Sequence, residues 1–182
     1  MENKYNSLSG LSTKSWGPSG WSFLFSCIIG AYPPQIDPKN KEHQKIKKHF
    51  KNMLSSLVYT MPCVFCRNSY KQFIKELPME PFLSGRLKLF EWLYLIRDKV
   101  NKKLIDQEQQ CYNDEKKRLK KIYHNSNRTP QDKNDYYSKL EQFKKETFIT
   151  HNSPPLVEIF DKYESIRANC SNRAKTRIIK KQ

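Results

Sequence analysis

Apolar residues are concentrated in one stretch of this chain, and that uneven distribution most constrains the fold. Residues 16–104 contain all 3 tryptophans and, counted together, most of the Leu, Ile and Phe residues, whereas residues 105–150 are dominated by Lys, Gln, Asn, Asp and Glu. Because only 37% of the residues are hydrophobic and the mean hydropathy is −0.85, a core can form only where apolar residues gather. We therefore expect one domain built from the first hundred or so residues, followed by a polar extension.

Within this stretch the apolar residues recur at helical spacing, and no segment shows the alternating pattern of a strand. Ser15 is a plausible cap for the first helix, with Pro18 in its first turn, and Ser84 is a plausible cap for the fourth. The predicted helices span residues 16–29, 40–59, 63–76, 84–104, 107–124, 135–148 and 156–166, with a linker at 125–134. Short loops between the first four favour antiparallel neighbours, so the sequence predicts an all-α bundle.

The formal net charge is +16, which raises the question of nucleic-acid binding. Most positive charges are interleaved with acidic residues, and only Arg173–Lys181 forms a basic tail without them, so nucleic acid is not an expected partner. The apolar run Trp21–Ala31 is about half the roughly 18 residues that a membrane span needs, and it follows a polar start rather than a basic signal peptide. We expect a soluble, intracellular protein without a membrane partner.

Two of the cysteines form a Cys-x-x-Cys motif at a predicted helix start. An odd total in a chain without a signal peptide argues against a disulfide-stapled secreted fold. The motif spacing lets the sulfurs of Cys63 and Cys66 approach each other, and the helix dipole is expected to lower the pKa of the first thiol. Pro62 is expected to leave that sulfur accessible. The 5 cysteines are Cys27, Cys63, Cys66, Cys111 and Cys170.

Zinc binding is the main alternative for the motif, because structural zinc sites use the same spacing. His43 and His49 could complete a Cys₂His₂ set. However, positions six apart on a helix point about 240° apart, and a second compact ligand pair is absent from the sequence. We expect no metal site. A purely structural cysteine pair is a further alternative.

A redox pair needs an electron acceptor, and the aromatic residues suggest one. A thioredoxin-like fold would place the motif after a strand, which the sequence does not predict. Five aromatic residues could instead wall a flat ring system, although aromatic side chains of this kind also serve as ordinary core residues. They are Trp16, Trp21, Phe25, Trp92 and Tyr94.

Three motifs in this order resemble the Erv/ALR family of FAD-linked sulfhydryl oxidases. The first is the opening helix from Trp16 to Leu24, which reads WGPSGWSFL. The second is the aromatic-P-C-x-x-C segment from Tyr59 to Cys66. The third is Trp92-Leu93 followed by Val100-Asn101-Lys102-Lys103-Leu104. The WGP opening and the compact size are most similar to the versions encoded by large DNA viruses, which would place the protein in the host cytoplasm and the virion.

The resemblance implies a four-helix bundle with a short fifth helix, noncovalent FAD and a homodimer. It implies that Cys63 exchanges with a dithiol client protein or a small redox carrier, and that Cys66 passes the electron pair to the flavin. Dioxygen would be the final acceptor, yielding hydrogen peroxide. The family contacts FAD at positions that correspond to Trp16, Gly17, Trp21, Phe25, Trp92, Arg97, Val100, Asn101 and Lys103.

This chain departs from the family pattern at three places. Phe25 stands where the family usually has a histidine, and Arg97-Asp98 stand where it has His-Asn. Phe25 can pack on the cofactor without hydrogen bonding, and Arg97 can stack on adenine or pair with phosphate. Cys111 lies where the family often has a structural cysteine, but Leu89 occupies the usual partner position.

The expected organisation is an arm at residues 1–13, an oxidase domain at residues 14–111 and a lysine-rich, helical extension at residues 112–182. Cys111 is expected to be a free thiol, and a shuttle pair or intermolecular disulfide involving Cys111 and Cys170 stays open. Two alternatives remain for the function. One is a zinc-stapled helical module with a basic tail for nucleic acid or an acidic partner, and the other is a degenerate oxidase that serves as a scaffold.

Overall fold

The computed structural model describes residues 9–123, 129–148, 153–171 and 175–178. The chain divides into two compact units, Met1–Arg97 with Pro154–Gln182, and Asp98–Ser153. The predicted boundary between oxidase domain and extension, at residue 111, is a functional division and stays a prediction.

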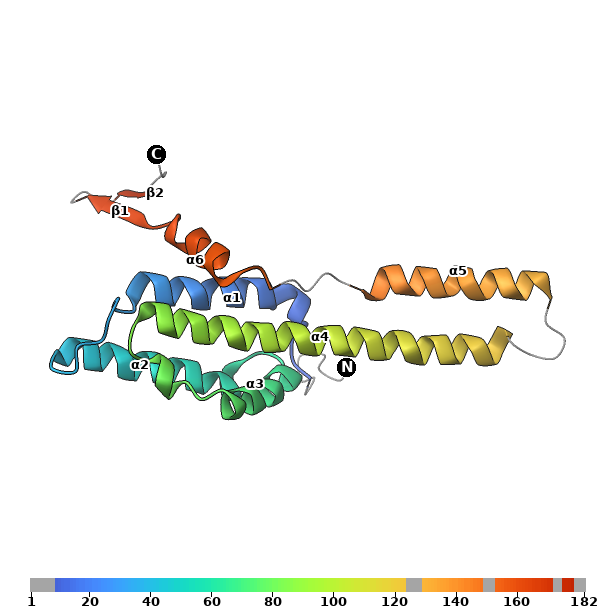
Figure 1. Ribbon diagram of the computed structural model, residues 1–182, viewed down its shortest axis with the longest axis horizontal. Helices are drawn as coiled ribbons and strands as arrows, with labels where there is room; N and C mark the ends of the chain where they lie inside the picture. Colours follow the sequence, from blue (N-terminus) through green and yellow to red (C-terminus); the bar gives the residue numbers. More distant parts are fainter. Residues whose placement is uncertain (1–8, 124–128, 149–152, 172–174, 179–182) are drawn as a thin grey trace, which may run out of the picture. The chain divides into compact units, whose positions relative to one another are not determined.

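The prediction of an all-α fold is confirmed. In the first unit, three helices and the beginning of a fourth pack together, and a short fifth helix lies against them (Figure 1). A 3₁₀ turn over Glu80–Phe82 precedes the fourth. The helices are α1 (Thr13–Ala31), α2 (Lys41–Thr60), α3 (Val64–Glu76), α4 (Arg86–Tyr123) and α6 (Leu156–Glu164).

Helix α1 begins earlier than the sequence predicts. Ser12 precedes it without a side-chain cap, and Ser15 lies inside its first turn, so the predicted cap at Ser15 is wrong. Pro18 consequently lies inside the helix rather than in its first turn. The helix tolerates this proline because only the hydrogen bond to Lys14, close to the free end, is lost.

Helix α4 is one continuous helix of 38 residues, where two helices separated near residue 105 were predicted. No Gly or Pro lies between Arg86 and Tyr123, and the polar residues there are good helix formers, so a change of composition does not end the helix. The residue before the helix is Gly85, whose carbonyl accepts from the Leu89 N–H at 3.0 Å. The predicted cap Ser84 instead accepts from the Ile36 N–H through its carbonyl.

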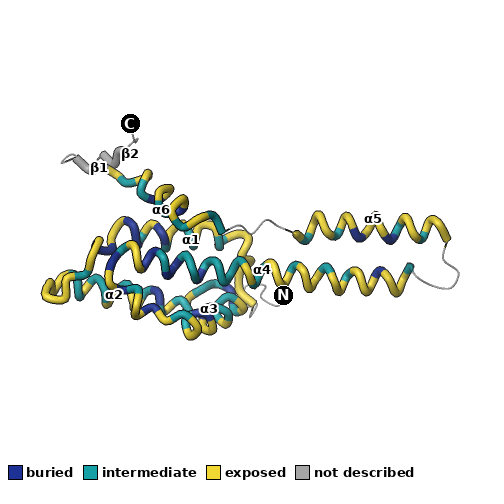
Figure 2. Tube along the Cα trace, viewed as in Figure 1, coloured by how far each residue is buried: buried dark blue, intermediate teal, exposed yellow. Residues whose placement is uncertain are grey.

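The core of the first unit is aromatic and aliphatic, and its buried side chains come from all five helices and the loop before α4 (Figure 2). Phe25 of α1 lies between Phe90 of α4 at 4.8 Å and Tyr163 of α6 at 5.4 Å, measured between ring centroids. Beyond α6, the Arg167 guanidinium donates to the Ile29 carbonyl at 3.0 Å. These contacts hold α6 against α1 and α4.

The loops before α2 and α4 are joined through Tyr32. Its hydroxyl donates to the Leu83 carbonyl at 2.8 Å, and its own carbonyl accepts from Arg86 Nε at 2.7 Å. Gly85 lies so close to this junction that a Cβ there would be 2.5 Å from the Pro34 carbonyl oxygen. The close approach therefore requires glycine at this position.

Burial raises the pKa of the Tyr32 hydroxyl to about 12. In the unfolded chain a tyrosine ionises near pH 10. The neutral Tyr32 hydroxyl therefore stabilises the folded protein fully below about pH 10. As the pH rises to 12, this contribution to the free energy of unfolding falls by about 1–2 kcal/mol. Urea unfolding between pH 9 and 12 measures this loss, and we expect a shallower fall in Tyr32→Phe. An equal slope in both proteins would contradict the assignment.

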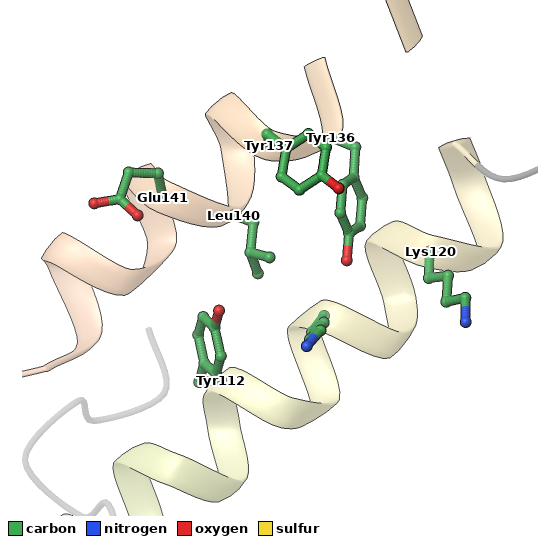
Figure 3. Close-up of a pocket in the computed structure, with 7 residues that line it drawn as sticks. Tyr112, Lys120, Tyr136, Tyr137, Leu140 and Glu141 are labelled. Carbon is green, nitrogen blue, oxygen red and sulfur yellow. The ribbon is translucent and has the colours of Figure 1, made fainter. Parts of the chain in front are cut away.

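The second unit contains the C-terminal part of α4 and helix α5 (Pro130–Thr147). Leu119, Tyr136 and Leu140 form a small buried cluster. Helix α5 begins within the predicted linker because Thr129 and Asp132 form a capping box around Pro130. Residues 125–128 of that linker lie outside the described part. An open pocket of about 420 Å³ in this unit is lined by Tyr112, Lys116, Lys120, Tyr136, Tyr137, Leu140 and Glu141. Figure 3 shows it in close-up.

A two-stranded antiparallel hairpin follows α6, where no strand was predicted. Strand β1 (Ala168–Ser171) pairs with β2 (Lys175–Ile178), with Ala168 opposite Ile178. Four-residue strands with mostly polar side chains show no alternating signal. Among the described helices, none combines the length and the apolar character that a bilayer span requires.

Candidate functional site

The Cys-x-x-Cys motif lies at the junction of α2 and α3. Cys63 is the N-cap of α3, and its Sγ accepts a hydrogen bond from the Cys66 backbone N–H at 3.3 Å. The first turn of α3 contains no acidic residue. The structure thus places the Cys63 sulfur at the N-terminal end of α3, where the sequence predicts that the motif begins a helix.

Side-chain hydrogen bonds fix the start of α3 against α2. The Tyr70 hydroxyl, on α3, donates to the Leu54 carbonyl of α2 at 2.9 Å and is buried. Arg67 Nη1 donates to the Met61 carbonyl at 2.5 Å, across the turn that precedes the motif. The hydrogen bonds of Tyr70 and Arg67 therefore restrain the segment that contains Cys63.

The exposure of Cys63 differs from the prediction. Only 6% of the residue is exposed, whereas Cys66 is half-buried. The cover is a short segment from the predicted arm, in which the Leu11 N–H donates to the Pro62 carbonyl at 2.8 Å and the Val64 N–H donates to the Ser9 carbonyl at 3.3 Å. The accessible sulfur predicted from Pro62 is therefore wrong, because residues 9–11 pair with the motif. Residues 1–8 of the arm lie outside the described part.

Three of the predicted cofactor residues lie on α1 with partly exposed side chains. Trp16 Nε1 is buried and has no hydrogen-bond partner among the residues that the structure describes. Its ring lies over Gly20, where a Cβ would come within 3.2 Å of Cε3. Space is open around Gly17, and Trp21 is half-buried. An indole N–H without an acceptor fits a ligand that supplies one, as the heteroatoms of a flavin or an adenine do.

Two other predicted cofactor residues are core residues in this structure. Phe25 is fully buried between Phe90 and Tyr163. Trp92 is also fully buried, and its Nε1 donates to the Leu77 carbonyl at 3.0 Å. Their side chains are covered by protein, so their clearest role is to support the packing of α1, α3 and α4.

Arg97 lines a pocket of about 210 Å³ beside α6. The other lining residues are Pro154, Glu158, Ile159, Lys162 and Tyr163. Arg97 and Lys162 bring two positive charges to this pocket and Glu158 brings one negative charge. Lys162 and Tyr163 were not predicted as site residues. Their helix has a recognisable apolar spacing, but nothing in the sequence indicates that it packs beside Arg97.

Val100, Asn101 and Lys103 lie on the part of α4 that belongs to the second unit, and all three are half-buried. Asn101 Nδ2 donates to Ser153 Oγ at 2.9 Å. On the same stretch of α4, the Lys102 ammonium lies 2.7 Å from an Asp98 carboxylate oxygen and lowers the pKa of that carboxyl group. The predicted cofactor contacts of these three residues stay predictions.

The structure does not assemble the zinc set considered from the sequence. His43 lies in the first turn of α2 and accepts from the Asp37 N–H at 3.1 Å. Cys63 follows the other end of this helix, about 30 Å away along the axis. Among the described residues, no group of three or more His, Cys, Asp or Glu side chains could hold a metal ion.

Two of the remaining cysteines, Cys27 and Cys111, have described side chains, and both are free thiols. Cys27 is half-buried on α1, and burial raises the pKa of its thiol. Cys111 is an exposed free thiol on α4. The Cys170 side chain lies outside the described part, so the shuttle with Cys111 stays a prediction. The side chains of the basic tail Arg173–Lys181 lie outside it as well.

The motif lies within a region of similarity to known proteins. A family model described as the Erv1 / Alr family matches residues 18–124. The mitochondrial FAD-linked sulfhydryl oxidase ERV1 of Saccharomyces cerevisiae is 32% identical over 88 residues. That similarity covers 48% of this chain and 42% of the yeast protein, so the chain spans less than half of this relative's length.

Proposed function

The chain belongs to the Erv1/Alr family, and from this membership we propose that it is an FAD-dependent sulfhydryl oxidase that forms disulfides in client proteins. The observation that carries the proposal is the position of Cys63. It is the N-cap of α3, and its sulfur accepts the Cys66 N–H, which supports a redox role for the two cysteines.

The two cysteines have unequal roles in this proposal. A client thiolate attacks Sγ of Cys63 in the oxidised pair, the bond between Cys63 and Cys66 breaks, and Cys66 leaves as a thiolate. The second client thiolate then attacks the client sulfur and releases Cys63. The client loses two electrons and gains a disulfide, and the cysteine pair gains those two electrons.

The cofactor that reoxidises the pair is FAD, which when bound supplies an acceptor for two electrons and a route from the thiols to dioxygen. In the first unit, Trp16, Gly17 and Trp21 offer partly exposed surface on α1, and the Trp16 N–H offers a donor. Arg97 offers a positive charge that suits a phosphate or an adenine ring. Phe25 and Trp92 support these residues from the core.

Further features of the proposal rest on the resemblance. They are a dithiol protein or small redox carrier as electron donor, dioxygen as final acceptor, hydrogen peroxide as product, and a homodimer. We also propose, from the WGP opening at Trp16, that the protein is most similar to the versions of large DNA viruses.

The proposal is tested by oxygen uptake. Protein expressed with added riboflavin and supplied with dithiothreitol should consume oxygen, and should produce hydrogen peroxide in equal amount. Protein boiled before the assay is the control for uncatalysed oxidation. Absence of oxygen uptake above this control, in protein that contains flavin, would contradict the proposed activity.

A further inference from the structure

Residues Ser9, Gly10 and Leu11, here called the strap, pair with the backbone of Pro62, Cys63 and Val64. Gly10 forms an isolated antiparallel bridge with Cys63. The Leu11 N–H donates to Pro62, and the Val64 N–H donates to Ser9. The segment at the motif thus behaves as a strand edge that accepts an extended partner.

The register of this bridge places Gly10 directly opposite Cys63. Both hydrogen bonds run between the flanking residues, which is the pattern of a non-hydrogen-bonded antiparallel pair. In such a pair the facing Cα atoms are about 4.5 Å apart and the side chains lie on the same face. A cysteine of an extended partner that pairs in this register would therefore present its sulfur to that of Cys63, at a backbone separation that a disulfide tolerates.

Gly10 places no side chain opposite Cys63. Its φ is +76°, and a Cβ built on it would lie 1.8 Å from the Pro62 carbonyl oxygen. The strap therefore covers Cys63 with backbone alone, in a conformation open only to glycine. An ordinary peptide would pair with the same edge in an extended conformation and would keep its side chain.

The strap is held by little besides its backbone. Ser9, Gly10 and Leu11 are all exposed, and the Leu11 side chain, at 64%, is not buried in the core. An extended segment that makes the same two hydrogen bonds and also contacts apolar surface would compete with it.

Two exposed aromatic residues lie within and shortly before the motif. Phe65, between the two cysteines, is 67% exposed, and Tyr59, at the end of α2, is 81% exposed. Exposed aromatic side chains near a redox motif offer contacts to the apolar residues of an unfolded chain.

We propose that the edge Pro62–Val64 is the docking site for an extended, cysteine-containing segment of a client polypeptide, which pairs antiparallel with it and displaces the strap. This inference rests on the proposed function and adds the class of substrate. The client cysteine lies opposite Cys63. The residue before it accepts from the Val64 N–H, and the residue after it donates to the Pro62 carbonyl. Unfolded or loop segments fit this edge, and cysteines inside helices do not.

Mixed-disulfide formation without flavin or oxygen tests the docking. The protein is the full-length Cys66→Ser variant. The probe is a peptide whose cysteine forms a disulfide with thionitrobenzoate. The Cys63 thiolate attacks the cysteine sulfur of this peptide. One disulfide forms between Cys63 and the peptide, one breaks, and thionitrobenzoate is released and measured by its absorbance. The probe is a blocked Val-Val-Cys-Val-Val peptide.

Two methylated peptides make the comparison specific. N-methylation of the valine after cysteine removes the N–H predicted to donate to Pro62, and should slow the reaction about fivefold, the factor for one backbone hydrogen bond. N-methylation of the valine before cysteine removes the N–H that corresponds to that of Ser9, which makes no hydrogen bond to Val64 in the structure because Val64 begins α3, and it should leave the rate unchanged. Equal rates for all three peptides would overturn the docking register.

Strap variants of the Cys66→Ser protein provide the second test. Leu11→Pro removes the N–H that donates to Pro62 and should raise the rate of Cys63 alkylation by iodoacetamide about fivefold. Leu11→Ala keeps that N–H and should react at the parent rate. Gly10→Val should raise the alkylation rate as Leu11→Pro does. Gly30→Ala should react at the parent rate, because no atom lies within 4 Å of a Cβ at Gly30. Unchanged alkylation in both Leu11→Pro and Gly10→Val would overturn the strap's role.

These results are separable from the proposed function. Failure of the peptide and strap tests, together with oxygen uptake on dithiothreitol, would remove the docking site and leave the oxidase. Register-dependent peptide rates without oxygen uptake would support the docking site and remove the oxidase.

Discussion

Replacing Cys66 by serine is expected to lower turnover with dithiothreitol by about a thousandfold or more, while bound flavin and helical content stay unchanged. Cys66 has to leave when a client thiolate attacks Cys63, and serine cannot form the disulfide that is attacked. The backbone N–H that donates to Cys63 Sγ remains, so the start of α3 should be preserved. Oxygen uptake and the visible spectrum measure the two effects.

The control for this substitution is Cys111→Ser, which removes an exposed free thiol on α4. It should retain the parent turnover with dithiothreitol. If the Cys66→Ser protein kept its turnover, Cys66 would not be the residue that passes electrons onward. If both variants lost turnover, Cys111 would take part in the electron path.

The second large effect is expected from Phe25→Ala, which should lower the free energy of unfolding by about 3–5 kcal/mol. The side chain is fully buried and contacts rings from two other helices, at 4.8 Å and 5.4 Å. Its removal leaves a cavity among α1, α4 and α6. Since a whole domain is stable by only about 5–15 kcal/mol, this loss is severe. Urea unfolding of the flavin-free protein measures it.

Phe23→Ala is the matched control, because Phe23 lies on the same helix and is 63% exposed. It should change the free energy of unfolding by no more than about 0.5 kcal/mol. Similar small losses for both variants would contradict the assignment of Phe25 to the core.

Helix boundaries were predictable where the sequence contains local signals. Residues 40–59 were expected to form a helix, and α2 spans Lys41–Thr60, because the Asn40 side chain accepts from the Glu42 and His43 N–H groups. The start of α3 at Cys63 was predictable for a similar reason, since Pro62 interrupts the preceding helix. The sequence does not predict the continuity of α4, because the change from apolar to polar residues near residue 105 resembles the end of a helix.

Contacts between distant segments were less accessible from the sequence. The strap is joined to Pro62 and Val64 by backbone hydrogen bonds, which leave no side-chain pattern in residues 9–11. Phe25 was predicted to contact the cofactor because of its position in a motif. Its burial depends on Tyr163, 138 positions later in the sequence, and periodicity within one helix does not reveal such a partner.

The visible absorption spectrum under anaerobic conditions tests the central claim most directly. Protein expressed with excess riboflavin should be yellow, should lose its flavin absorption when dithiothreitol is added without oxygen, and should regain it when oxygen is admitted. In the Cys66→Ser variant the flavin absorption should persist after dithiothreitol is added. A colourless protein that contains stoichiometric zinc, or a flavin absorption that dithiothreitol does not change in the parent protein, would contradict the account.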